Sequence, residues 1–249
     1  METKAAVEGL VKWIQERVRE AGARGIVVGL SGGIDSAVTA ALAARACPGE
    51  TLGVIMPCHS DPQDAEDARL VARHLQLPTA VVDLTPVYDA LVTALGENPG
   101  QAAPRDLARA NLKPRLRMAT LYFFANRRNY LVAGTGNRSE LTVGYFTKYG
   151  DGGVDILPLG GLVKQQVRLL AYYLDIPREI IARRPSAGLW EGQTDEGEMG
   201  LTYEELDHFL LTRQGRPEVV ERVTRLSLAS EHKRRLPAVP DPVLAPDPE

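Results

Sequence analysis

The stretch VVGLSGGIDSAVTAALA, residues 27–43, decides how the rest of the sequence is interpreted. It begins as an apolar run typical of a buried strand and ends with the composition of a helix. Between these parts stand two adjacent glycines, two serines and an aspartate within six positions, which is more than a simple turn requires. Backbone N–H groups and a helix N-terminus at such a junction can bind an anion. The stretch therefore predicts a phosphate-binding loop at the end of a strand.

The loop also contains a carboxylate, Asp35, that needs its own explanation. Glycines let the backbone approach a phosphate closely, because a Cβ would hold the phosphate away. A carboxylate beside that phosphate repels it unless a divalent cation lies between them, and Mg²⁺ favours carboxylates together with phosphate oxygens. The alternative is that Asp35 only caps the following helix. The pattern as a whole favours the phosphate and Mg²⁺.

Strand-like and helical stretches alternate along the first half of the sequence. Apolar runs predict strands at 25–30, 51–57, 79–84 and 129–135, and helical patterns lie between them at roughly 35–46, 61–76, 86–95 and 105–126. Short apolar strands separated by helices predict an α/β fold with a parallel sheet that helices cover on both faces. Ligands of such sheets bind at the carboxyl ends of the strands.

The second half is organised differently. A Gly-rich stretch at 144–161 precedes expected helices near 164–174, 202–212 and 217–230. The sequence shows no internal repeat and no linker, so we expect one α/β domain over residues 1–237. The Pro-rich residues 238–249 are expected to form a flexible tail.

The composition excludes several classes of protein. The chain has 249 residues, 44% of them hydrophobic, and a formal net charge of −3, so nothing attracts it generally to nucleic acid or to anionic membranes. No apolar stretch approaches the roughly 20 residues of a membrane span. Cys47 and Cys58 are the only cysteines, which excludes a disulfide framework and a four-cysteine zinc site, and no suitably spaced ligand accompanies Cys58 and His59. We expect a cytoplasmic protein.

A second set of polar residues follows the last predicted strand, in GTGNRSELTVGYFTKYGDGGVDILPLGGLVK, residues 134–164. Thr135 could donate to a nucleotide, and Glu140 could be a second ligand of the metal held by Asp35. Lys164 opens a helix, where a cation is unfavourable unless an anion such as a triphosphate offsets it. Taken one by one, Lys148 and Asp155 could instead form a surface salt bridge and Lys164 could be solvated.

These motifs together resemble a known family. SGGIDS resembles the pyrophosphate-binding loop of enzymes that cleave ATP to AMP and pyrophosphate. Residues 134–164 are similar to the G-T-x-x-x-x-E … G-x-F-T-K-Y-G-D-G-x-x-D … P-L-x-x-L-x-K signature of the ammonia-dependent NAD synthetases. Three further blocks agree with that family: NLKPRLRM (111–118), RRPSAGLWEGQTDEGEMGLTYEELD (183–207) and EHKRRLP (231–237). The resemblance spans roughly residues 5–237 in unbroken order.

The resemblance implies a Rossmann-like three-layer sandwich and a set of site residues. Asp35 and Lys164 are implied as catalytic, and Asp35 and Glu140 as Mg²⁺ ligands. The implied ATP-binding residues are Gly29, Leu30, Ser31, Gly32, Gly33, Ile34, Asp35, Ser36, Thr135, Lys164 and Ser186. The implied deamido-NAD-binding residues are Arg115, Lys148, Asp155, His232 and Lys233. Gly136 and Asn137 depart from the Asp-His pair of some bacterial members, and a basic run such as 232–235 is by itself usually a solvated face.

The implied reaction is the ATP-dependent amidation of deamido-NAD with ammonia, which gives NAD, AMP and pyrophosphate through an acyl-adenylate. The family also implies a homodimer with sites at the subunit interface. An acyl-adenylate must be shielded from water, and the Gly-rich residues 186–199 are suited to a mobile cover. No general base for ammonia stands out, and Asp195 in this cover is a weak candidate.

Free ammonia is the expected nitrogen source. The predicted helix at 5–20 leads directly to the strand at 25, which leaves no room there for an amidase domain, and neither cysteine resembles an amidase nucleophile. A separate glutaminase that feeds the chain is compatible with the sequence. Two rival functions are disfavoured: a tRNA-modifying enzyme would need a basic surface and cysteine pairs, and a non-catalytic nucleotide sensor would not need Glu140, Lys148, Asp155 and Lys164 together.

Overall fold

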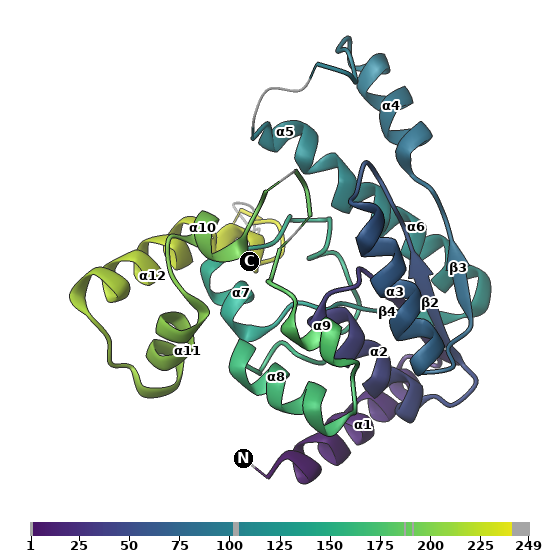
Figure 1. The fold of residues 1–249 in the computed structure, drawn as a ribbon, viewed down its shortest axis with the longest axis horizontal. Coiled ribbons are helices and arrows are strands. Elements are labelled where there is room, and N and C mark those ends of the chain that lie inside the picture. The colour runs from purple at the N-terminus through teal and green to yellow at the C-terminus, as the bar shows by residue number, and fades with distance from the viewer. Residues whose placement is uncertain (1, 102–104, 187, 191, 241–249) are drawn as a thin grey trace, which may run out of the picture.

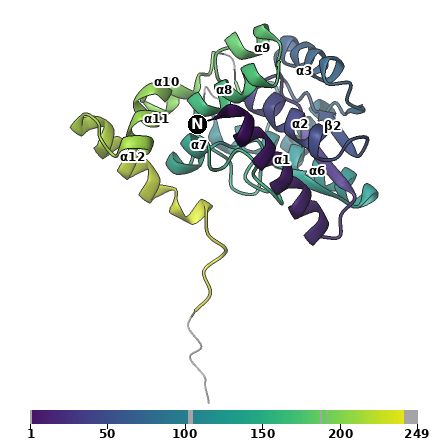
Figure 2. The ribbon, with the colours of Figure 1, turned by 90° about the horizontal axis from the view of Figure 1, so that it is seen from below.

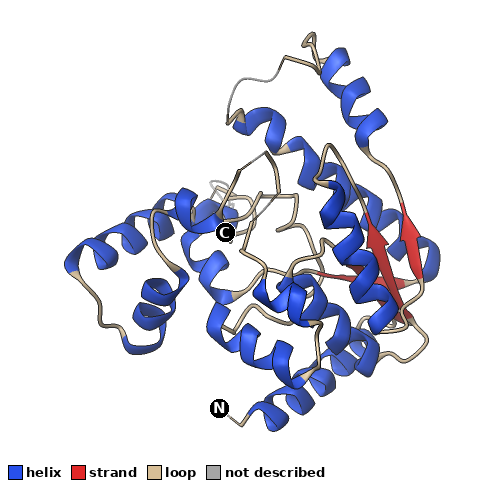
Figure 3. Cartoon of the chain, in the orientation of Figure 1, coloured by secondary structure: helices blue, strands red, loops and turns tan. Residues whose placement is uncertain are grey.

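A parallel sheet of four strands lies on one side of the molecule (Figure 3). The computed structural model describes residues 2–101, 105–186, 188–190 and 192–240. The strands are β1 (Gly25–Gly29), β2 (Thr51–Ile55), β3 (Thr79–Val81) and β4 (Tyr130–Ala133), in the spatial order β3-β2-β1-β4. β1 lies between β2 and β4, with Ile26 opposite both Thr51 and Leu131. The residues that follow β1 and β4 therefore leave the sheet side by side.

Helices cover both faces of this sheet (Figure 1). Alternate residues of a strand point to opposite faces, so Ile26 and Val28 belong to one apolar core and Val27 to another. The first core is completed by α1 (Thr3–Glu20), α2 (Ile34–Ala46), α3 (Pro62–His74), α8 (Lys164–Tyr173) and α9 (Arg178–Ala182). The second is completed by α4 (Thr85–Ala94) and α6 (Leu112–Arg128). The prediction of an α/β three-layer sandwich is confirmed.

The expected helix at 105–126 is in fact two helices, α5 (Leu107–Ala110) and α6. Pro114 is the third residue of α6. It has no N–H, and in a continuous helix its ring would clash with the carbonyl of residue 110, so the chain interrupts the helix at Asn111 and begins again at Leu112. The third strand is also shorter than expected: β3 ends at Val81, and Asp83 accepts a hydrogen bond from the Thr85 N–H (2.9 Å) at the start of α4.

A helical hairpin projects from the side of the molecule opposite the strands (Figures 1 and 2). It consists of α11 (Tyr203–Thr212) and α12 (Pro217–Ala229), which form a third apolar cluster with Val143 of α7 (Arg138–Val143) and with Val163. The short helix α10 (Asp195–Met199) leads into this hairpin, and η1 (Glu231–Lys233) follows it. Through this cluster, α11 packs beside the beginning of α8.

The C-terminal tail is described only in part. Residues 238–240 are exposed and belong to no helix or strand, and the remainder of the predicted tail, 241–249, lies outside the described residues. Within the described ranges, no helix has the length and apolar character needed to cross a membrane.

Candidate active site

Hydroxyl groups of the loop between β1 and α2 form hydrogen bonds with its own backbone. The Ser31 Oγ accepts a hydrogen bond from the Gly33 N–H (3.2 Å), and the Ser36 hydroxyl donates to the Gly33 carbonyl (2.8 Å). Gly32 adopts a φ of +80°, and a Cβ there would lie 2.7 Å from the Asp64 carbonyl oxygen of α3. Glycine is therefore required at position 32 for close packing as well as for its backbone conformation.

Asp35 does not cap α2. The N-cap residue is Gly33, and Asp35 lies in the first turn, where it faces other elements of the fold. Its carboxylate forms an ion pair with Lys164 and accepts a hydrogen bond from Asn137 Nδ2 (3.0 Å). The capping alternative for Asp35 is thus wrong, and its charge is directed across the carboxyl edge of the sheet.

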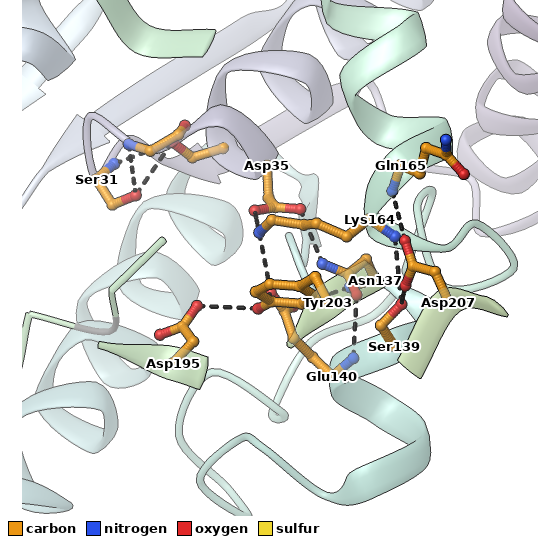
Figure 4. Close-up of polar contacts among 12 residues, drawn as sticks. Ser31, Asp35, Asn137, Ser139, Glu140, Lys164, Gln165, Asp195, Tyr203 and Asp207 are labelled. Carbon is orange, nitrogen blue, oxygen red and sulfur yellow. Dashed lines mark hydrogen bonds and ion pairs between the residues drawn. The ribbon is translucent and has the colours of Figure 1, made fainter. Parts of the chain in front are cut away.

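Lys164 joins three elements that are far apart in the sequence (Figure 4). It is the first residue of α8, its side chain is only 2% exposed, and it pairs with Asp35 of α2 and with Glu140 of α7 (3.3 Å). Glu140 is oriented by a capping box, in which the Asn137 side chain accepts from the Glu140 N–H (3.0 Å) and Glu140 accepts from the Asn137 N–H (3.1 Å). The alternative of a solvated Lys164 is therefore wrong.

Burial and pairing have opposite effects on these charges. Burial raises the pKa of Glu140 above its ordinary value, and the Lys164 ammonium limits this rise. Burial alone would lower the pKa of Lys164, but Asp35 and Glu140 together raise that pKa above its ordinary value. Lys164 therefore remains an ammonium ion at neutral pH, in a position where charge is poorly screened by water.

Tyr203 and Asp195 also belong to this cluster, although the sequence motifs assign no role to Tyr203. The Tyr203 hydroxyl lies 2.9 Å from Asp195 Oδ2 and 3.1 Å from Glu140 Oε1, and the Lys164 Nζ lies 4.8 Å from the centre of the Tyr203 ring. Burial raises the pKa of Tyr203, which keeps the hydroxyl a neutral donor, and it also raises the pKa of Asp195. Asp195 Oδ1 is buried without a hydrogen-bond partner among the described residues.

The donor set at this position is compatible with Mg²⁺. No group of three or more His, Cys, Asp or Glu side chains in the described part of the chain is arranged to enclose a metal ion. Mg²⁺ does not require such a group, since it usually binds through one or two carboxylates and completes its shell with water and phosphate oxygens. Asp35 and Glu140 supply two carboxylates at one site, each with its side chain 15% exposed. They fit a Mg²⁺ ion that arrives with a nucleotide.

Thr135 and Ser186 are two further residues predicted to bind ATP. Thr135 stands in the loop between β4 and α7, and the Ser186 Oγ accepts from the Gly188 N–H (3.1 Å). Ser186 belongs to the predicted cover, of which Ala187 and Glu191 lie outside the described residues. Lys113 of α6 donates to the Leu189 carbonyl (2.8 Å), which connects the predicted cover to α6.

Four of the five residues predicted to bind deamido-NAD lie at or beside the C-terminal turn, and Asp155 makes separate contacts. Arg115 and Lys148 lie together with the C-terminal turn, because Arg115 donates to the Lys148 carbonyl (3.5 Å) and Lys148 Nζ donates to the His232 carbonyl (2.7 Å). Lys233 donates instead to two main-chain carbonyls of residues 144–146, both at 2.8 Å. The basic run is therefore not a merely solvated face.

Asp155 binds neither Lys148 nor another lysine. It accepts from the Tyr122 hydroxyl (2.9 Å) of α6 and from the Val132 N–H (2.8 Å) of β4. The surface salt bridge between Lys148 and Asp155 is therefore not formed. Asp155 joins α6 to the sheet beside the group that contains Lys148.

Comparison with known proteins assigns this arrangement to a family. The sequence model described as NAD synthase matches residues 6–237. The chain belongs to the NAD synthase family. Among its relatives, an NH3-dependent NAD⁺ synthetase of Carboxydothermus hydrogenoformans is 58% identical over 94% of this chain and 96% of its own length.

Solved structures of similar proteins agree with this NAD synthase fold. The NMN synthetase from Francisella tularensis superposes with a TM-score of 0.90 at 40% identity, covering 97% of this chain and 99% of its own. The NH3-dependent NAD synthetase from Campylobacter jejuni, in complex with nitrate, superposes with a TM-score of 0.78 at 29% identity, covering 97% and 100%.

Proposed function

We propose that this NAD synthase amidates the nicotinate carboxylate of deamido-NAD with ammonia, using ATP and releasing AMP and pyrophosphate. The names of its close relatives support this activity. The observation that carries the proposal is the pairing of Lys164 with Asp35 and Glu140 beside the SGGIDS loop. Two carboxylates and an ammonium beside a phosphate loop suit the cleavage of ATP between its α- and β-phosphates.

The reaction needs two steps because a carboxylate is a poor electrophile whose leaving group would be oxide. In the first step, a carboxylate oxygen of the substrate attacks the α-phosphorus of ATP, the bond to the β-phosphate breaks, and pyrophosphate leaves. In the second step, ammonia attacks the carbonyl carbon of the acyl-adenylate, AMP leaves with the bonding electron pair, and the nitrogen loses a proton. Both steps need a site that stabilises negative charge on phosphate oxygens.

The residues of this chain can supply that stabilisation. The amides of the loop that begins at Ser31, together with the N-terminus of α2, would bind the pyrophosphate portion of ATP. The Lys164 ammonium would donate to phosphate oxygens next to its partner Asp35. Mg²⁺ held by Asp35 and Glu140 would, when bound, neutralise phosphate charge. Arg115, Lys148 and His232, which lie in one group, would bind the dinucleotide substrate.

A mononucleotide is the second candidate substrate. The similarity to the Francisella NMN synthetase favours a mononucleotide substrate, since the Francisella structure superposes on this chain with a TM-score of 0.90. The chemistry at the nicotinate carboxylate would be identical, and only the adenylate half of deamido-NAD would be missing. The two candidates differ in whether the residues around Lys148 contact a second nucleotide.

The test compares the two acids directly. Purified protein is incubated with ATP, Mg²⁺, ammonium and either deamido-NAD or nicotinate mononucleotide, and NAD, nicotinamide mononucleotide and AMP are separated by chromatography. We expect NAD and AMP in equal amounts and a kcat/KM that favours deamido-NAD at least tenfold. A preference for the mononucleotide would identify the second candidate, and AMP formation without an amide product would contradict both.

We further propose that the chain works in the cytoplasm as a homodimer with its sites at the interface, as the family resemblance implies. Phe123 of α6 is a position at which to test for an interface, because this large apolar side chain is 57% exposed. Light scattering during gel filtration should give twice the monomer mass, and Phe123→Glu should lower it. A monomer at micromolar concentration would contradict the proposal.

A further inference from the structure

The beginning of α8 combines two unfavourable features. Its N-cap residue is Val163, whose side chain cannot accept a hydrogen bond, and its first residue is Lys164, whose ammonium lies at the positive end of the helix dipole. The first N–H groups of a helix have no partner within the helix, and both Val163 and Lys164 are buried. Acceptors must therefore come from elsewhere in the fold.

Two distant residues supply these acceptors. The Lys164 N–H donates to the Ser139 Oγ (3.2 Å), and the Gln165 N–H donates to Asp207 Oδ2 (2.7 Å). The Ser139 hydroxyl in turn donates to the other carboxylate oxygen, Asp207 Oδ1 (2.5 Å). Figure 4 shows this chain of contacts beside the Lys164 side chain. Asp207 thus caps α8 from another helix and brings a negative charge to its N-terminus.

The same contacts connect the two elements that carry the charges of the site. Ser139 precedes Glu140 on α7, and Gln165 follows Lys164 on α8. Asp207 of α11 binds both neighbours, and it is only 3% exposed, while Ser139 is fully buried. A shift of α7 against α8 would therefore break a hydrogen bond to a buried charged group, which is among the more costly contacts to lose.

We propose that Asp207 is a positioning residue of this enzyme. By holding Ser139 and the Gln165 N–H at once, it fixes the separation between the Glu140 carboxylate and the Lys164 ammonium. It does not touch the substrate. The expected effect of Asp207 on turnover rests on the proposed function. Its expected effect on the binding of metal and nucleotide can be measured independently of that function.

Three variants test this role: Ser139→Ala, Asp207→Asn and the double variant. Ser139→Ala removes one hydroxyl with little change in volume, and Asp207→Asn keeps the shape but removes the charge and one acceptor. Leu210→Ala is the matched control, because Leu210 is buried on the same helix in the apolar cluster and offers no side-chain polar group. Each protein is measured for unfolding temperature, steady-state kinetics and affinity for Mn²⁺·ATP by electron paramagnetic resonance.

We expect both single variants to lower kcat at least tenfold and to weaken Mn²⁺·ATP binding at least fivefold, with the KM for deamido-NAD within twofold of wild type. Because both residues act through one connection, the kcat of the double variant should be at most threefold below that of the less active single variant. Leu210→Ala should lower the unfolding temperature but leave kcat and Mn²⁺·ATP affinity within threefold.

Several results would overturn the positioning role. These are wild-type kcat and Mn²⁺·ATP affinity in both single variants, losses that multiply in the double variant, or an equal loss of kcat in Leu210→Ala. If the wild-type protein forms neither NAD nor nicotinamide mononucleotide, the proposed function fails instead. The Mn²⁺·ATP measurements then still decide whether Asp207 positions the charged residues.

Discussion

Replacing Lys164 with methionine is the most direct test of the electrostatics of the site. Methionine has nearly the length and shape of the lysine stem but no charge, so the change deletes the ammonium and little else. Lys164 is 2% exposed, and its partners Asp35 and Glu140 are each 15% exposed. The variant therefore leaves two carboxylates facing each other in a region that water reaches poorly.

The contact geometry gives the size of the effect. At 3.3 Å, the distance from Lys164 Nζ to Glu140, two unit charges interact by about 5 kcal/mol at an effective dielectric constant of about 20. Removing one partner of a buried ion pair usually costs about 3–5 kcal/mol. Since both carboxylates retain some exposure, we expect a loss of about 3 kcal/mol in the free energy of unfolding at pH 8, which corresponds to a fall of about 6–12 °C in the unfolding temperature.

The loss should depend on pH in a defined direction. Burial already raises the pKa of Glu140, and Lys164 opposes that rise, so the pKa of Glu140 rises further in the variant. A carboxyl group whose pKa is higher in the folded than in the unfolded state stabilises the fold at low pH, and this stability disappears as pH rises through the folded-state pKa. The deficit of Lys164→Met should therefore shrink between pH 8 and pH 5.

Urea unfolding monitored by circular dichroism, in EDTA and without nucleotide, measures this deficit at each pH. Lys12→Met is the matched control, because Lys12 is exposed on α1, and we expect a change within about 0.5 kcal/mol. Turnover of Lys164→Met should fall at least a hundredfold at saturating substrate. A deficit below 1 kcal/mol at pH 8, or one that stays constant down to pH 5, would refute the electrostatic argument.

Three further predictions concern the metal, the cover and the nitrogen source. Asp35→Asn and Glu140→Gln should each lower kcat at least a hundredfold, about 3 kcal/mol, while the fold stays intact, and near-normal turnover at ordinary Mg²⁺ would contradict the assignment. Amide hydrogens of residues 186–199 should exchange quickly in the free protein and slowly with ATP and deamido-NAD bound, whereas equal rates would exclude a mobile cover. The rate at fixed total ammonium should rise from pH 7 toward pH 9, because neutral ammonia attacks, and glutamine alone should give almost no NAD. Burial raises the pKa of both thiols, which disfavours the thiolate that an amidase nucleophile needs. The double variant Cys47→Ser, Cys58→Ser should therefore keep its ammonia-dependent turnover. If the protein uses glutamine and either cysteine change abolishes that use, the prediction is wrong.

The sheet and the phosphate loop could be predicted because their signals are local. The apolar run at 25–30 and the glycines that follow it specify a strand, a loop and a helix within a few residues. Position 32 needs glycine for reasons that the local sequence shows only in part, since the packing of its α-carbon against α3 depends on the tertiary fold. The division at Asn111 has a local cause, Pro114, which the expected helix at 105–126 did not take into account.

The sequence predicts which charged residues belong to the site, but it does not predict which of them pair with one another. Asp35, Glu140 and Lys164 each follow or begin an element at the carboxyl edge of the sheet, so the topology alone predicts that they come together. Their pairing depends on the rotation of α7 and α8 about their axes. The Asn137 capping box sets the first of these rotations, and this box could have been identified from N-R-S-E at 137–140.

The role of α11 depends on a spacing that the sequence does contain. Tyr203 and Asp207 are four residues apart, so on a helix they lie on the same face, one turn from each other. Two polar side chains on a face that also carries buried leucines must find partners when that face packs, because an unpaired buried carboxylate is costly. The helix that follows Val163 lacks a capping side chain and begins with lysine, so it needs an acceptor and a negative charge from another element. The missing acceptors of α8 and the carboxylate of Asp207 on α11 therefore complement each other, and the two helices pack together. Tyr203 lies one turn before Asp207 on α11, so this packing also brings its hydroxyl to Glu140.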